Sequence, residues 1–184
     1  MTKTIGIFVG SLRKASFSRK LAENIRDMAP AGFEFKMMET GHLPLYNQDY
    51  DDHHEVPQSY MEFREEVKGL EGVLFITPEY NRSVPAVLKN ALDVASRPYG
   101  KNCWDNKPGA VFSSSMGNIA GFGANHHLRQ CLVFLNVPVM QQPEVYLPQI
   151  QNCLDEHGKL KTDTEELVKK AVDAYIRWFN RLIQ

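Results

Sequence analysis

Short apolar runs alternate with longer amphipathic stretches along the chain, and this alternation constrains the fold more than any other feature. The apolar runs predict strands at residues 4–9, 33–38, 73–77, 109–113 and 137–140, the last with 145–147 as a candidate continuation. The amphipathic stretches predict helices at residues 17–28, 58–70, 84–95, 124–135 and 162–183. Because the apolar runs lack strict alternation, they suit a parallel sheet covered on both faces. We therefore expect one α/β domain over residues 1–184, a doubly wound five-stranded parallel sheet of order 2-1-3-4-5 with helices on both faces.

Two of these helices carry capping signals at their starts. Ser83 precedes the helix at 84–95 and is its predicted N-cap, with Pro85 tolerated in the first turn. Thr162 and Glu165 have the spacing of a capping box at the start of the last helix.

The overall composition excludes several classes of partner. The formal net charge is -1, so the chain has no general attraction to nucleic acid or to an anionic membrane. No apolar run approaches the roughly 20 residues that a membrane-spanning helix needs, and the first residues do not follow a signal-peptide pattern. We therefore expect a cytoplasmic protein without a membrane partner. Cys103, Cys131 and Cys153 are odd in number and widely separated, which argues against a disulfide framework and against a metal cluster.

The loop at residues 10–18 follows the first predicted strand and leads directly into a helix. A helix start offers unpaired N–H donors and a positive dipole, and Ser11, Ser16 and Ser18 add hydroxyls. Arg13 can pair with a phosphate dianion. The loop matches neither a Walker A sequence nor G-x-G-x-x-G, which weakens ATP, GTP and dinucleotide interpretations. It predicts a site for a single phosphate monoester, and the alternative is a solvated turn with a helix cap.

Two further loops leave the carboxyl ends of predicted strands. The loop at 78–83 presents Tyr80 and Asn81, whose surroundings suit a flat heterocycle, although an exposed Tyr at a loop tip is often only surface. The loop at 113–118, followed by Gly121 and Gly123, offers hydroxyls and small residues that allow close backbone approach to a ligand. Since the strands are parallel, all three loops share one edge, and the first two flank the switch-point crevice.

The histidine pairs do not form an evident metal site. His126 and His127 are adjacent in a predicted helix, where neighbouring residues do not share a face. His53 and His54 lie in the acidic segment 49–55, which lacks recognised ligand spacing and is better interpreted as a solvated loop. No G-x-S-x-G nucleophile motif is present in the sequence.

Together these segments resemble the NADPH-dependent FMN reductase family of flavodoxin-like fold, in particular its quinone, chromate and azo-dye reductase branch. The most specific match is Thr-Pro-Glu-Tyr-Asn-Arg-Ser-Val-Pro at 77–85, beside Gly-Ser-Leu-Arg-Lys-Ala-Ser-Phe-Ser at 10–18. Further matches are Leu-Pro-Leu-Tyr-Asn at 43–47, Leu-Lys-Asn-Ala-Leu-Asp at 88–93, Ser-Ser-Met-Gly at 114–117 and His-Leu-Arg-Gln at 127–130. The resemblance covers residues 4–180.

The resemblance implies a set of FMN-binding residues. Ser11, Arg13, Ser16 and Ser18 would hold the phosphate, and Ser18 stands where Asn is frequent in the family, although a hydroxyl can also donate. The isoalloxazine and ribityl region would lie against Pro78, Glu79, Tyr80 and Asn81, with Ser115 and Gly117 on the other side. The backbone of residues 115–118 is the candidate donor set for the flavin N1 and C2 carbonyl. The predicted set also includes Phe17, Ser83 and Met116.

The resemblance also implies an activity and an assembly. Hydride would pass from NADPH or NADH through FMN to quinones or similar acceptors such as chromate, azo dyes, nitroaromatics or free flavin, in a ping-pong cycle. Because FMN carries the chemistry, no catalytic side chain and no metal are expected. Arg82 and Arg97 are candidates for a nucleotide 2′-phosphate. A homodimer is implied, with residues 46–50 reaching a partner's site, and a homotetramer is a further implied assembly, although Gly-Phe-Gly-Ala at 121–124 departs from related sequences.

A second function remains open on the residues alone. A flavodoxin-type carrier would shuttle electrons between protein partners without using NADPH. Such carriers tend to be strongly acidic for docking, whereas this chain is near neutral, which argues against that function.

Overall fold

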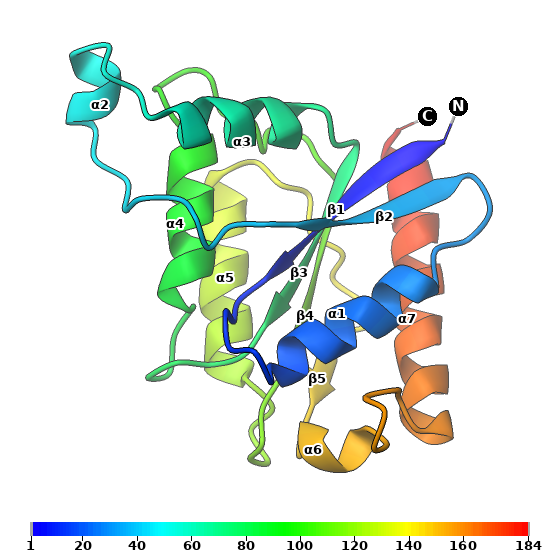
Figure 1. The fold of residues 1–184 in the computed structure, drawn as a ribbon. Helices are drawn as coiled ribbons and strands as arrows, with labels where there is room; N and C mark the ends of the chain where they lie inside the picture. The colour runs from blue at the N-terminus through cyan, green and yellow to red at the C-terminus, as the bar shows by residue number, and fades with distance from the viewer. Residues whose placement is uncertain (1, 184) are drawn as a thin grey trace.

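The computed structural model describes residues 2–183 and has a five-stranded parallel sheet at its centre (Figure 1). The strands are β1 (Lys3–Val9), β2 (Phe33–Met38), β3 (Gly72–Thr77), β4 (Gly109–Ser114) and β5 (Val145–Leu147). Their order is β2-β1-β3-β4-β5, and every neighbouring pair is parallel. The predicted doubly wound α/β fold and its strand order are confirmed.

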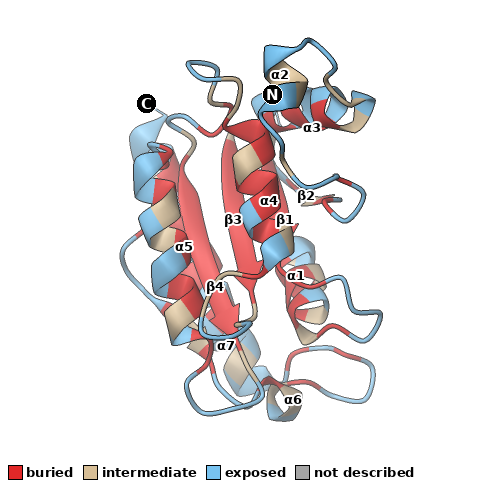
Figure 2. Cartoon of the chain, turned by 90° about the vertical axis from the view of Figure 1, so that its left-hand side faces the viewer, coloured by how far each residue is buried: buried red, intermediate tan, exposed pale blue. Residues whose placement is uncertain are grey.

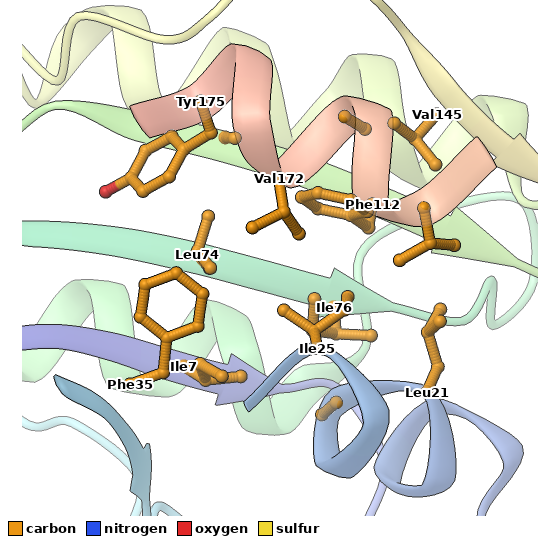
Figure 3. Packing of buried hydrophobic residues seen from close by; sticks show 14 of the residues in the cluster. Ile7, Leu21, Ile25, Phe35, Leu74, Ile76, Phe112, Val145, Val172 and Tyr175 are labelled. Atoms are coloured by element: carbon orange, nitrogen blue, oxygen red, sulfur yellow. The ribbon is translucent and has the colours of Figure 1, made fainter. Parts of the chain in front are cut away.

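Helices cover both faces of this sheet (Figure 1). They are α1 (Phe17–Asp27), α2 (Asp49–Asp52), α3 (Gln58–Lys68), α4 (Ala86–Ala95), α5 (Phe122–Phe134), α6 (Ile150–Cys153) and α7 (Thr162–Leu182). Side chains of α1 and α7 such as Ile25 and Val172 pack with Leu74 and Ile76 on one face (Figure 3). On the other face, α3, α4 and α5 pack around Phe75 and Trp104. Burial on both faces explains why the strands are continuously apolar.

The fifth strand differs from the prediction. Residues 137–140 contribute only a single bridge, between Gly109 and Val139, and the strand proper is Val145–Leu147, paired with Phe112–Ser114. Gly109 N–H donates to the Pro138 carbonyl oxygen and Met140 N–H to that of Gly109, but Pro138 lacks the N–H that would extend this ladder.

Both predicted capping signals are wrong. Helix α4 starts at Ala86 with Pro85 in the N-cap position, and the Ser83 hydroxyl instead lies 3.0 Å from His127 Nδ1. Thr162 is already the first residue of α7, and Lys161 occupies the N-cap without a side-chain hydrogen bond. A residue with helical backbone geometry cannot act as the N-cap, so Thr162 and Glu165 do not form a capping box.

Within residues 2–183, no helix is long and apolar enough to cross a membrane, and no group of His, Cys, Asp and Glu side chains could hold a metal ion. The three cysteines are free.

The acidic segment 49–55 is not simply solvated. Asp51 forms a bidentate ion pair with Arg64 of α3. Both N···O distances are 2.8 Å, and both side chains are at least nine-tenths buried. Arg64 Nε also donates to the carbonyl oxygen of Val94 at 2.9 Å. This pair therefore fixes α2 and the end of α4 to α3.

We expect Asp51→Ala to destabilise the protein by about 3 kcal/mol, because it leaves a buried guanidinium without its counter-charge. Asp52→Ala removes an equal charge from an exposed position in the same helix and should cost less than about 0.5 kcal/mol. Urea unfolding of both variants measures the difference, and equal stabilities would contradict the structural role of the pair.

Candidate functional site

A cavity of about 180 Å³ lies at the carboxyl edge of the sheet, where the loops after β1, β3 and β4 meet. Most of the predicted site residues line it. They are Ser11, Arg13, Ser16, Phe17, Ser18, Pro78, Glu79, Tyr80, Ser115 and Met116. Ser114 and Ile150 complete the lining and are not among the predicted contacts.

The start of α1 forms the first wall of the cavity. Ser16 is the N-cap, and its hydroxyl oxygen accepts from the N–H of Arg19 at 3.1 Å. Among residues 2–183, the N–H groups of Phe17 and Ser18 have no hydrogen-bond partner in the chain, and Arg13 forms no ion pair. Ser11, Ser16 and Ser18 are each at least nine-tenths buried. Free N–H donors, hydroxyls and an unpaired guanidinium on one wall form a donor set suited to a phosphate.

Gly10 sets how closely the first two loops approach. A Cβ at this position would lie 2.8 Å from Pro78 Cδ and 3.0 Å from Leu88 Cδ1. The Gly10 N–H donates to the carbonyl oxygen of Ile76 at 2.9 Å, which continues the β1–β3 ladder into the loop. Gly10 is therefore required for loop packing.

The second loop ends in a tight reverse turn. Tyr80 and Ser83 exchange backbone hydrogen bonds of 3.2 and 2.9 Å, and Asn81 and Arg82 between them have positive φ angles of 49° and 67°. Two successive left-handed residues are typical of a two-residue hairpin turn. The turn leaves Tyr80 on the cavity, and Asn81 and Ser83 outside its lining.

Glu79 differs from its expected role beside the flavin ring. Its side chain is 10% exposed and lines the cavity, but the carboxylate is engaged by protein groups. One oxygen accepts from the N–H of Ala124 at 3.1 Å, and the other lies 3.2 Å from an Arg82 guanidinium nitrogen. The side chain thus joins the second loop to the start of α5.

Backbone hydrogen bonds connect the third loop to β5 and to the start of α6. The Ser115 N–H donates to the Leu147 carbonyl oxygen at 3.2 Å, and the N–H groups of Ile150 and Gln149 donate to the carbonyl oxygens of Ser115 and Gly117. Within the described chain, the N–H groups of residues 116–118 remain without a partner. The candidate donor set at 115–118 therefore reduces to 116–118. Gly117 itself lies outside the cavity lining.

Sequence reasoning missed Ile150 because the chain returns to the cavity through α6, a single helical turn without a strong pattern. Ser114 falls inside the predicted third loop, but it is the last residue of β4 and is buried. Its position at a strand end was the available signal.

A second and larger cleft of about 550 Å³ lies between α4 and α5. Figure 2 shows these two helices on the side of the sheet that faces the viewer. Ser83 and His127 line it, and Phe134 at its edge is 79% exposed. His126 turns the other way, with Nε2 2.9 Å from the hydroxyl of Tyr146. The prediction that the adjacent histidines do not share a face is confirmed.

Comparison with known proteins agrees with this geometry. The family model described as NADPH-dependent FMN reductase matches residues 3–152. A quinone reductase of Pseudomonas putida is 47% identical over 175 residues, covering 95% of this chain and 94% of the relative. A 2-hydroxy-1,4-benzoquinone reductase of a Burkholderia species is 41% identical, covering 97% of each chain.

A solved structure has the same fold as this chain. The flavoenzyme NAD(P)H:(acceptor) oxidoreductase of Paracoccus denitrificans superposes with a TM-score of 0.90, at 36% identity, over 98% of each chain. This chain belongs to the NADPH-dependent FMN reductase family, and it is an FMN- and NAD(P)H-dependent oxidoreductase with a flavodoxin-like fold.

Proposed function

We propose that this protein passes hydride from NADPH or NADH to quinones and similar small acceptors, in a ping-pong cycle on one FMN. The observation that carries the proposal is the convergence of three loops on one cavity, with a phosphate-type donor set on one wall. The names of the two quinone reductase relatives support quinones as the acceptor class. Chromate, azo dyes, nitroaromatics and free flavin are further acceptors to test.

The phosphate of FMN would bind at the start of α1. The N–H groups of Phe17 and Ser18 and the hydroxyls of Ser11 and Ser18 would donate to it, with Arg13 as counter-charge. Ser16 would donate its hydroxyl proton while its oxygen still accepts from Arg19.

The flavin ring would lie between the second and third loops, against Pro78, Tyr80 and Met116. The free N–H groups of residues 116–118 would face its N1 and C2 carbonyl. Bound FMN supplies the redox chemistry, accepting hydride from the nucleotide and delivering it to the acceptor. The chain's part is to hold and orient the ring, so that nucleotide and acceptor reach it in turn through the exposed side of the cavity near Tyr80 and Met116.

We further propose that the protein is a cytoplasmic homodimer joined over the cleft between α4 and α5. Phe134, which lines the cleft, is 79% exposed, and its neighbour Val133 is 76% exposed, so α5 presents two adjacent uncovered apolar side chains that a partner could cover. Helix α2 lies at the end of the molecule away from the start of α1 (Figure 1), so residues 46–50 would contribute to the site of a partner rather than to the cavity of their own chain. The three free thiols fit a reducing compartment.

Removing phosphate donors should weaken FMN binding without unfolding the protein. We expect Ser18→Ala and Arg13→Ala each to raise the FMN dissociation constant about tenfold, since a hydrogen bond to a charged group contributes about 1.5 kcal/mol. Lys14→Ala is the matched control, because Lys14 is exposed in the same loop but does not line the cavity. Fluorescence titration with FMN measures all three, and equal affinities would contradict the assignment. Ser16 is unsuitable for this test, because its loss also removes the cap of α1.

Anaerobic stopped-flow absorbance tests the cycle and separates it from the electron-carrier alternative. NADPH or NADH should bleach the flavin band of the FMN-loaded protein within seconds, and a quinone added afterwards should restore it. A flavin band that neither nucleotide bleaches would instead favour a flavodoxin-type carrier.

The dimer is tested by its exposed apolar residues. Phe134→Asp should convert the protein to a monomer, because it places a charge within the proposed interface. Leu167→Asp, at a side chain on α7 that is 49% exposed and outside the cleft, should leave the dimer intact. Sedimentation velocity distinguishes the two, and a monomeric unmodified protein would overturn the proposal.

A further inference from the structure

The Glu79 carboxylate joins two loops that stand on different strands. Glu79 follows β3, whereas its partner Ala124 lies in the first turn of α5, after β4. The contact is tight, because a Cβ on Gly123 would lie 2.9 Å from Glu79 Oε2 and 2.8 Å from the Arg82 carbonyl oxygen. Only glycine at 123 lets the second loop approach α5 this closely.

Helix α5 has no cap of its own. Its N-cap is Gly121, which has a positive φ of 74° and no side chain to accept a hydrogen bond. Among the described residues, Glu79 Oε2 is the only hydrogen-bond partner of the Ala124 N–H. Glu79 therefore acts as the missing cap from another loop, and its negative charge suits the positive end of the helix dipole.

Glu79 and Arg82 form an ion pair in which one side chain is largely buried and the other is exposed. The Glu79 side chain is 10% exposed and the Arg82 side chain 73% exposed, at an N···O distance of 3.2 Å. Within the described chain, Glu79 is the one carboxylate among the cavity-lining residues, and Arg13 is the other charged group there. In the proposed function the phosphate dianion balances the charge of Arg13. The negative charge of Glu79 then acts on the part of the cavity that the flavin ring would occupy.

We propose that Glu79 is a positioning residue, which sets the spacing of the second and third loops through the Ala124 N–H. We also propose that Glu79 and Arg82 together tune the reduction potential of the bound flavin. The second part rests on the proposed function, and the first does not. A negative charge on the cavity wall opposes the electrons added to the ring, whereas the guanidinium partly offsets that charge.

Three substitutions separate the two roles. Glu79→Gln keeps an oxygen that can accept from Ala124 but loses the charge, so Arg82 is released. Glu79→Ala loses both the acceptor and the charge. Arg82→Gln keeps the carboxylate and removes its counter-charge. Glu71→Gln is the matched control, because Glu71 also accepts from a backbone N–H, that of Thr4, and pairs with Lys3, but at the amino ends of the strands.

Amide exchange of Ala124, followed by NMR in the protein without FMN, tests the positioning role. Glu79→Ala should accelerate this exchange about tenfold, because loss of a capping acceptor that costs about 1.4 kcal/mol changes the opening equilibrium by that factor. Glu79→Gln should change it less than threefold, and Glu71→Gln should leave it unaltered. Unchanged exchange in Glu79→Ala would overturn the positioning role whether or not FMN binds.

The midpoint potential of the FMN-loaded protein tests the tuning role. Glu79→Gln should raise the potential and Arg82→Gln should lower it, by a smaller amount because Arg82 is exposed and screened. Glu71→Gln should leave it unchanged. Shifts of the same sign in both variants, or none, would overturn the tuning role, since a merely structural disturbance does not produce opposite signs. Failure of the unmodified protein to bind FMN would overturn the proposed function and this role, but not the capping of Ala124.

Discussion

One row of paired residues crosses four strands near the carboxyl edge of the sheet, and the arrangement of the candidate site depends on it. Val9 pairs with Ile76, Ile76 with Phe112, and Phe112 with Val145. All four are buried apolar side chains on the face covered by α1 and α7. Because side chains alternate along a strand, a shift of one residue in any pair would move a side chain from the core under α1 and α7 to the core under α3, α4 and α5, where different side chains pack. The register therefore fixes where each chain segment leaves the sheet.

Direct contacts between the loops then set their spacing. Gly10 lets the first loop lie against Pro78 of the second. Glu79 ties the second loop to α5, and the N–H of Ile150 ties α6 to Ser115 of the third. Each link uses protein groups other than the backbone N–H donors at the start of α1 and in residues 116–118. The N–H groups of Phe17, Ser18 and residues 116–118 are consequently left free for a ligand.

Much of the fold follows from the sequence because continuous apolar strands and amphipathic helices have different periods. The fifth strand was predicted only in part: Val145–Leu147, the candidate continuation, forms it, whereas Val137–Met140 is equally apolar but includes Pro138, which lacks a ladder N–H. Ser83 and Thr162 were wrong as caps because Ser, Thr and Glu spacing gives no information on where the backbone becomes helical. Local sequence signals are weakest where tertiary contacts choose the helix start.

The candidate site could likewise be predicted only in part from the sequence. Most predicted residues line the cavity, because loops after parallel strands share one edge. The contact of Glu79 with Ala124 could not be predicted, since it spans 45 residues and depends on the missing Cβ of Gly123.

A crystal structure of the FMN complex tests the central claim most directly, namely that the three loops form one flavin site with its phosphate at the start of α1. The account predicts phosphate oxygens within hydrogen-bond distance of the Phe17 and Ser18 N–H groups, and the ring between Tyr80 and residues 116–118. A phosphate bound elsewhere, such as in the cleft between α4 and α5, would contradict it.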